Sequence, residues 1–264
     1  MVKSILLDKY TEIAHFYTSR QGGVSVGNYA SFNLSPFSGD DPVHLDENNQ
    51  LLCQKLGIEP SKLIIPFQTH GTEIRVIDPS FFQLSADEKI QSLNGVDALI
   101  TELPGVCIGV STADCVPLIF FDSIRKVVAV AYAGWRGTCA RIAEKTVLAM
   151  TEKFGCNAAD ILVSIGPSIS VEVYEVGNEV VESFERAGFV TEEIFAERNG
   201  SFYLDLWEAN RQSLLKVGIR PEQIEIAGIC TYSEHERFFS ARRLGIKSGR
   251  MLSGIMIQCA NVLM

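Results

Sequence analysis

Val116-Pro-Leu-Ile-Phe-Phe121 and Lys126-Val-Val-Ala-Val-Ala-Tyr132 are two of the most apolar stretches of the chain, and only four residues separate them. Two further apolar runs, Ala98–Thr101 and Val106–Val110, precede them, and turn residues such as Ser111–Asp114 separate the runs. Short runs of β-branched and aromatic residues between turn signals are typical of buried strands. The middle of the chain is therefore predicted to form the strands of a central sheet.

Further elements are predicted on both sides of this segment. Strands are expected at Ile13–Thr18, Ile161–Ile165, Ile224–Cys230 and Met251–Gln258; helices are expected from Pro42 to Gly57, over roughly sixteen residues up to Gly155, at about Asn178–Ala187, and from Asp205 to Gly218. The strands cluster, and the helices lie between or beside them without strict β–α–β alternation. We therefore expect one α+β domain over residues 1–264, with a mixed β-sheet core and helices packed outside.

The composition excludes several classes of protein. The chain has 264 residues, with 32 acidic and 23 basic side chains and a net charge of −9, which argues against a general binder of nucleic acids or anionic membranes. Its apolar stretches are far shorter than the roughly eighteen residues that a spanning helix needs, and Met1–His15 lacks the apolar core of a signal peptide. Seven cysteines without a CxxC pair indicate reduced thiols, so we expect a cytoplasmic protein.

His70 is one of only four histidines, and it lies in Gln68-Thr-His-Gly71, directly after the apolar run Leu63–Phe67. A polar side chain that follows a strand and precedes a glycine is well placed to face a cleft, where imidazole can bind a metal or transfer a proton. The alternative is a histidine in a surface loop with an ordinary pKa.

Cys115 differs from the other cysteines because it follows the polar turn Ser111–Asp114, whereas Cys107 has apolar neighbours on both sides. Polar neighbours and backbone N–H groups favour the thiolate, which is the form that ligates zinc or attacks carbon. The alternative is an inert cysteine in a loop.

Arg136 lies in Ala133-Gly-Trp-Arg-Gly-Thr138, at a predicted junction of strand and helix. The two glycines allow the backbone to approach a ligand, and the first N–H groups of a helix can bind an anion. The alternative is an ordinary helix start in which Trp135 covers the core.

A local excess of positive charge near the C-terminus could also bind an anion. It is formed by Arg237, Arg242, Arg243, Lys247 and Arg250, and Arg20 in the Gly22-Gly23 turn is a further candidate. The planar guanidinium suits phosphate or carboxylate groups. The alternative is a solvated surface that pairs with the acidic segment Glu172–Glu197.

A set of short motifs, in order along the chain, closely resembles the YfiH family, whose members are also labelled laccase-domain or polyphenol oxidoreductase proteins. The motifs cover roughly residues 13–258: Thr18-Ser-Arg-Gln-Gly-Gly-Val-Ser25, Ser31-Phe-Asn-Leu34, Gln68-Thr-His-Gly71, Asp97-Ala-Leu-Ile-Thr101, Thr112-Ala-Asp-Cys-Val-Pro117, Ala133-Gly-Trp-Arg-Gly-Thr138, Ile165-Gly-Pro-Ser168, Tyr174-Glu-Val-Gly177 and Phe239-Ser-Ala-Arg-Arg243.

The resemblance implies a mixed sheet, closed or sandwiched, and a zinc ion bound by a histidine, a cysteine and a second histidine. The first two ligands correspond to His70 and Cys115, but Tyr132 occupies the third position. A phenol ionises only near pH 10, so a neutral tyrosine is a poor zinc ligand. Copper is a weaker candidate than zinc because four histidines and five methionines cannot form a histidine-rich multicopper cluster.

The resemblance also implies a zinc-dependent purine nucleoside phosphorylase with adenosine deaminase side activity, which Tyr132 would impair. Its partners would be a purine nucleoside and phosphate. His70, Cys115 and Arg136 are the candidate catalytic residues, and Arg20, Asn33 and Arg243 are the candidate substrate-binding residues. Two alternatives stay open: a hydrolase or deamidase with Cys115 as nucleophile and His70 as base, and a non-catalytic nucleoside-binding protein.

Overall fold

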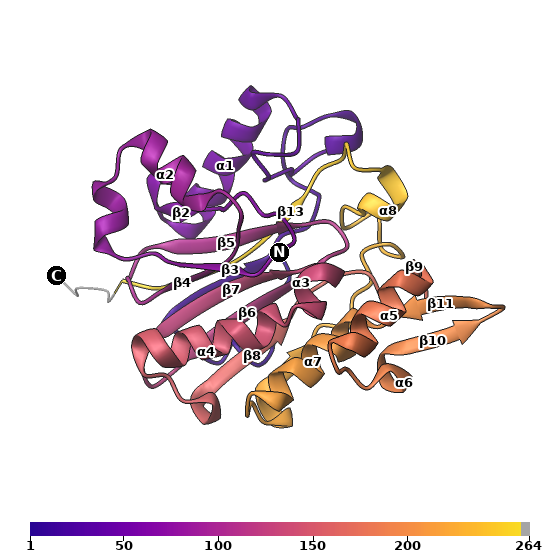
Figure 1. The fold of residues 1–264 in the computed structure, drawn as a ribbon. Coiled ribbons are helices and arrows are strands. Elements are labelled where there is room, and N and C mark those ends of the chain that lie inside the picture. Colours follow the sequence, from indigo (N-terminus) through magenta and orange to yellow (C-terminus); the bar gives the residue numbers. More distant parts are fainter. Residues whose placement is uncertain (260–264) are drawn as a thin grey trace.

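Two β-sheets packed face to face form the centre of the computed structural model, which describes residues 1–259 (Figure 1). The larger sheet has the strand order β12 (Ile224–Ile226), β8 (Ile161–Ile165), β6 (Val116–Asp122), β7 (Val127–Ala133), β4 (Val96–Thr101) and β3 (Glu73–Val76). The smaller sheet has the order β1 (Ile13–Tyr17), β13 (Met251–Ile257), β5 (Cys107–Thr112) and β2 (Leu63–Ile64). Both sheets contain parallel and antiparallel pairs.

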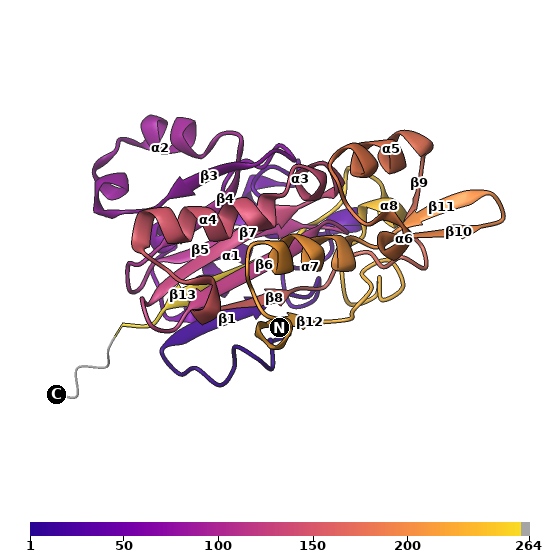
Figure 2. The same ribbon diagram turned by 60° about the horizontal axis from the view of Figure 1, so that its bottom comes forward.

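Helices cover the outer face of each sheet, which gives four layers (Figures 1 and 2). Helix α1 (Pro42–Leu56) packs on the smaller sheet, and α4 (Ile142–Phe154) and α7 (Leu206–Lys216) pack on the larger one. The remaining elements are α2 (Ala86–Leu93), α3 (Trp135–Cys139), α8 (Ala241–Leu244), and a lobe at one end made of β9 (Glu175–Val176), α5 (Asn178–Arg186), α6 (Thr191–Ile194), β10 (Phe195–Arg198) and β11 (Ser201–Leu204). The α+β class with a mixed, sandwiched sheet is confirmed, and the closed form does not apply to the described residues.

The side chains of β6 and β7 alternate between two apolar cores because successive residues of a strand point to opposite faces. Ile119, Val130 and Tyr132 lie in the core between the two sheets. Leu118 and Phe120 lie in the core beneath the helices. Every residue of both strands is buried, which explains why these segments are continuously apolar in the sequence.

The pairing of β6 with β7 places Tyr132 opposite Pro117 and Ala133 opposite Val116. The turn between the strands is held by Asp122, whose side chain accepts hydrogen bonds from the backbone N–H groups of Ile124 and Arg125. Because the strands are antiparallel, the residue that precedes β6 and the last residues of β7 meet at the same end of the hairpin.

Some helix and strand boundaries differ from the predicted ones. Gly57, in the left-handed conformation, closes helix α1 as expected, and Asp205 caps α7. The helix predicted over roughly sixteen residues up to Gly155 begins slightly later than expected, at Ile142, because Arg141 before it adopts φ +62°; the Arg141 guanidinium donates to the carbonyl oxygens of residues 187 and 188. The strand predicted to reach Cys230 ends at Ile226, after which the chain leaves the sheet.

The predicted domain boundary at residue 264 extends into residues 260–264, which lie outside the described part, so the boundaries stay a prediction. No helix in the described part is both long enough and apolar enough to cross a membrane.

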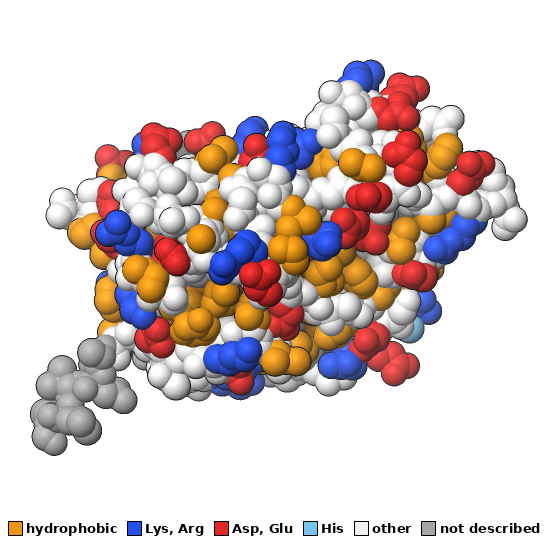
Figure 3. Space-filling model, turned by 90° about the horizontal axis from the view of Figure 1, so that it is seen from below, with side chains coloured by type: hydrophobic (Ala, Val, Ile, Leu, Met, Phe, Trp, Pro, Cys, Tyr) orange, Lys and Arg blue, Asp and Glu red, His pale blue; other side chains and the backbone are white. Residues whose placement is uncertain are grey.

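Acidic side chains of the segment 172–197 gather over the lobe that contains β9, β10 and β11 (Figure 3). No ion pair in residues 1–259 joins these side chains to the basic cluster at 237–250.

We predict that Tyr17→Phe lowers the free energy of unfolding by about 1–2 kcal/mol, because the buried Tyr17 hydroxyl in β1 donates a 2.7 Å hydrogen bond to Ser164 Oγ in β8 and so joins the two sheets. Tyr10→Phe is the matched control, since the Tyr10 ring packs on Phe121 but its hydroxyl has no hydrogen bond within residues 1–259. Urea denaturation measures both variants, and equal losses would contradict the role of the Tyr17 hydroxyl.

Candidate functional site

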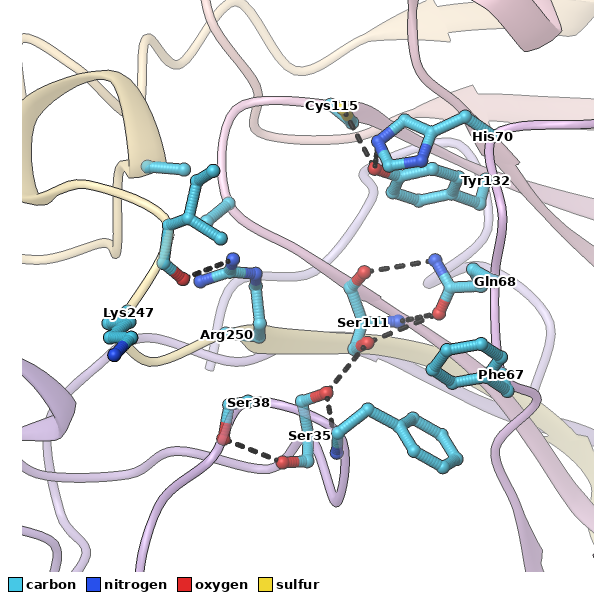
Figure 4. Close-up of a pocket in the computed structure, with 14 residues that line it drawn as sticks. Ser35, Ser38, Phe67, Gln68, His70, Ser111, Cys115, Tyr132, Lys247 and Arg250 are labelled. Atoms are coloured by element: carbon cyan, nitrogen blue, oxygen red, sulfur yellow. Dashed lines mark hydrogen bonds between the residues drawn. The ribbon is translucent and has the colours of Figure 1, made fainter.

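Cys115 and Tyr132 meet at the open end of the β6–β7 hairpin. Cys115 directly precedes β6, and Tyr132 is the penultimate residue of β7. The Tyr132 hydroxyl donates a hydrogen bond to Cys115 Sγ over 3.0 Å and lies 2.8 Å from His70 Nε2 (Figure 4). The rings of His70 and Tyr132 are edge to face, with centroids 5.0 Å apart. The three residues form one hydrogen-bonded group, named here the His–Tyr–Cys cluster.

His70 reaches the cluster from the connection between β2 and β3, where it adopts the left-handed value φ +63°. The buried Asp97 in β4 stabilises this conformation. Its carboxylate accepts three backbone hydrogen bonds, from the N–H groups of Thr69, His70 and Gly71 at 3.1, 3.0 and 2.8 Å. Burial raises the pKa of Asp97, although the three N–H donors oppose this shift. Asp97 therefore positions His70 without touching its ring.

Gly134 provides the space that the cluster occupies. A Cβ atom at this position would lie 3.0 Å from His70 Cδ2, 3.1 Å from Cys115 Sγ and 3.6 Å from Tyr132 Cε1. The glycine that was expected to approach a ligand instead approaches the three side chains of the cluster.

A cavity of about 410 Å³ opens in front of the cluster. Its lining combines aromatic, hydroxyl, amide and basic side chains, drawn in Figure 4: Ser35, Phe37, Ser38, Phe67, Gln68, His70, Ser111, Ala113, Cys115, Tyr132, Ala241, Ile246, Lys247 and Arg250. This size and mixture are typical of sites that enclose a small polar molecule.

One wall of the cavity is a hydrogen-bonded polar strip. Gln68 donates to the carbonyl oxygen of Ser111 over 3.0 Å and accepts from its N–H over 2.9 Å. The Ser111 hydroxyl donates to Gln68 and lies 3.3 Å from Ser35 Oγ. At the rim, the partly exposed rings of Phe37 and Phe67 form an edge-to-face pair with centroids 4.8 Å apart.

The opposite wall carries positive charge. The Arg250 guanidinium donates to the carbonyl oxygens of residues 246, 248 and 249, so it shapes the loop that carries Lys247. Asn33 lies behind this wall: its Oδ1 accepts from Arg250 N–H, and its Nδ2 donates to Ser38 Oγ. Asn33 is fully buried and supports lining residues rather than lining the cavity itself.

Asp114 fixes the turn that leads into Cys115. It adopts φ +84°, and its carboxylate accepts hydrogen bonds from Thr231 Oγ1, Ser240 Oγ and the N–H of Arg242. The C-terminal segment that follows these residues is thereby held against the cavity.

The members of the cluster are uncharged at neutral pH. Burial lowers the pKa of His70 below its usual value. Burial also raises the pKa of Cys115 to about 11 and the pKa of Tyr132 well above 10. A neutral thiol is a weak nucleophile, which disfavours the hydrolase alternative with Cys115 as the attacking group.

The candidate catalytic residue Arg136 and the candidate substrate-binding residues Arg20 and Arg243 do not line the cavity. Arg136 is exposed, and its guanidinium lies 4.3 Å from the centroid of the Trp135 ring, in a helix of only five residues. Arg20 donates to the carbonyl oxygens of residues 30 and 235. Arg243 is exposed and lies over the ring of Tyr232.

The donor set does not fit the zinc site that the resemblance implies. Of the four histidines, only His70 lines the cavity, and no group of three or more His, Cys, Asp or Glu side chains within residues 1–259 could hold a metal ion. The third potential ligand is the neutral phenol of Tyr132, which contacts both other donors directly.

Sequence reasoning did not identify several lining residues as functional. Arg250 and Lys247 were predicted only as members of a basic cluster that could bind an anion, Phe67 only as the end of an apolar run, and Phe37 and Ser35 had no predicted role. They come from loops without periodic patterns, so only the tertiary structure brings them together.

The chain is similar to known proteins over almost its whole length. The family model described as "Multi-copper polyphenol oxidoreductase laccase" matches residues 14–258. A Bacteroides thetaiotaomicron protein named purine nucleoside phosphorylase is 49% identical over 95% of this chain and 94% of its own length. The protein named adenosine deaminase RL5, from an unknown prokaryotic organism, is 41% identical over 94% of this chain and 95% of its own.

The fold matches as well. The crystal structure of YlmD from Geobacillus stearothermophilus has a TM-score of 0.88 and 33% sequence identity, covering 94% of this chain and 93% of that one. The resemblance inferred from the motifs is thus confirmed over nearly the whole chain. The protein belongs to the laccase-domain family that this model describes, together with the YfiH and YlmD proteins.

Proposed function

We propose that the protein is a purine nucleoside phosphorylase and that the cavity binds the nucleoside together with phosphate. The observation that carries this proposal is the lining: an aromatic pair, a polar strip, two cationic side chains and the His–Tyr–Cys cluster surround one space of about 410 Å³. The names of relatives such as the Bacteroides thetaiotaomicron protein support the same activity.

The aromatic rim suits the base. Phe37 and Phe67 are 48% and 42% exposed, which is unusual for such large apolar side chains, and flat purines bind well to aromatic surfaces. Gln68 and Ser111 lie further inside the cavity, where they can donate hydrogen bonds to a nucleoside and accept hydrogen bonds from it.

The cationic wall suits phosphate. Lys247 and Arg250 bring two positive charges to the cavity, in a chain whose net charge is −9. The hydroxyls of Ser35 and Ser38 face the same space, as Figure 4 shows. We therefore assign anion binding to Lys247 and Arg250 in place of Arg136, Arg20 and Arg243.

In this reaction a phosphate oxygen forms a bond to C1′ of the ribose while the bond from C1′ to the base nitrogen breaks. The electron pair of that bond goes to the base, which then takes up a proton. The bound phosphate stabilises the positive charge that develops on the ribose, and Lys247 and Arg250 hold it in place. The His–Tyr–Cys cluster lies at the other side of the cavity, where the N–H or S–H group that is not engaged within the cluster can donate a hydrogen bond to the departing base.

The expected location is the cytoplasm, which is supported by the free state of all seven cysteines.

Deamination of adenosine is a second candidate activity, favoured by the relative named adenosine deaminase RL5. The two reactions differ in their need for phosphate.

Incubation with inosine or adenosine should release free purine base and ribose 1-phosphate only when phosphate is present. Chromatography of the products measures this directly. Conversion of adenosine to inosine without phosphate would identify a deaminase instead. Nucleoside binding in calorimetry with no turnover of either kind would contradict the proposal and identify a binding protein.

Lys247→Ala should raise the KM for phosphate about tenfold, which corresponds to the loss of about 1.4 kcal/mol from one charge-assisted hydrogen bond. Arg136→Ala is the matched comparison, because the sequence alone favoured Arg136 as the anion ligand whereas the structure leaves it outside the cavity. Its KM should change less than twofold. The reverse order of effects would show that the anion binds near Trp135 and not in the cavity.

A further inference from the structure

We propose that the Tyr132 hydroxyl takes the place of the metal ion, so that His70, Tyr132 and Cys115 form a complete hydrogen-bonded cluster that does not bind zinc. The proposal concerns the same cavity as the proposed function but does not depend on which nucleoside reaction occurs there.

The distances in the cluster are those of hydrogen bonds and not those of metal ligands. Tyr132 Oη lies 2.8 Å from His70 Nε2 and 3.0 Å from Cys115 Sγ. Around a tetrahedral zinc ion, with Zn–N and Zn–O bonds near 2.1 Å and a Zn–S bond near 2.3 Å, neighbouring donor atoms are about 3.3–3.6 Å apart. The observed pairs are roughly 0.5 Å closer than that, so no ion fits among the three donors as they lie.

The hydrogen atoms of the three neutral groups account for both contacts. If the Tyr132 hydroxyl donates to Cys115 Sγ, its oxygen accepts from an N–H at His70 Nε2, which then has no lone pair for a metal. If the hydroxyl instead donates to His70 Nε2, it occupies that lone pair, and the Cys115 thiol donates to the phenol oxygen. In both tautomers Nε2 is engaged by Tyr132 and unavailable to zinc.

The surrounding structure holds Tyr132 in this position. Only 7% of the residue is exposed, and its ring packs in the core between the sheets with Val128 and Val130. Gly134 closes the other side, where even a Cβ atom would be crowded. The backbone bonds to Asp97 hold the His70 turn. To admit an ion, the phenol would have to leave a packed core.

The consequence for the site is a change in the kind of donor that it presents. The cluster presents neutral side chains that can donate a hydrogen bond to a molecule in the cavity. Hydrogen bonds, and not a metal ion, hold these side chains together. The Tyr132 hydroxyl thus joins His70 and Cys115 in place of an ion.

The test compares zinc binding by the native chain, Tyr132→His and Tyr132→Phe. Each protein is equilibrated with zinc, freed of unbound metal by gel filtration, and analysed for zinc by mass spectrometry; competition with a chelator gives the affinity. We expect the native chain to retain far less than one zinc per chain, and Tyr132→His to bind about one, more than about tenfold more tightly. Tyr132→Phe, which keeps the ring but not the hydroxyl, leaves two ligands and should bind weakly.

A second readout follows the thiol itself. Alkylation of Cys115, located by peptide mass spectrometry among the seven cysteines, should be unaffected by zinc in the native chain and slowed by zinc in Tyr132→His. Circular dichroism establishes that each variant is folded. If Tyr132→His does not fold, the native chain and Tyr132→Phe decide the question.

Stoichiometric zinc in the native chain, bound as tightly as in Tyr132→His, would overturn the proposal, because the phenol would then be a ligand. A folded Tyr132→His that binds no zinc would overturn it as well, because Tyr132 would not occupy a metal position. These outcomes are measured without substrate, so they are distinct from a failure of the nucleoside assay.

Discussion

The pairing of β6 with β7 is the constraint on which the site depends. Both strands are buried on both faces, so a shift of one residue would move every side chain into the wrong core. This register leaves Cys115 beside the end of β7 and directs Tyr132 toward the space between the sheets. The Tyr132 ring thus packs in the core while its hydroxyl reaches the cavity. The same side chain therefore stabilises the fold and forms part of the site.

Two buried carboxylates bring the remaining parts to this hairpin. Asp97 in β4, next to β7, holds the His70 turn by three backbone hydrogen bonds. Asp114, directly before Cys115, holds residues 231–242 and so helps to place the loop that carries Lys247 and Arg250. Neither carboxylate lines the cavity, yet each orders a loop whose backbone would otherwise have several conformations.

The sequence predicted those parts of the site that belong to strand ends. His70, Cys115 and Tyr132 adjoin apolar runs, and the motifs around them indicated that they belong together, which the hydrogen bonds bear out. Arg136 lies over the ring of Trp135 and outside the cavity, a position that the Gly-flanked sequence could not reveal, and its role stays a prediction. Phe37, Phe67 and Lys247 lie in loops, where no periodicity indicates which way a side chain points. The break at Arg141 likewise depends on carbonyl groups far away in the chain.

We propose a nucleoside site built on the laccase-domain fold, in which a tyrosine hydroxyl joins a histidine and a cysteine. The most direct test is a crystal structure of the protein grown with zinc, inosine and phosphate, with anomalous data at the zinc edge. The account predicts the base against Phe37 and Phe67, phosphate at Lys247 and Arg250, and no anomalous peak among His70, Tyr132 and Cys115. A zinc peak at that position, or the nucleoside bound outside the cavity, would contradict it.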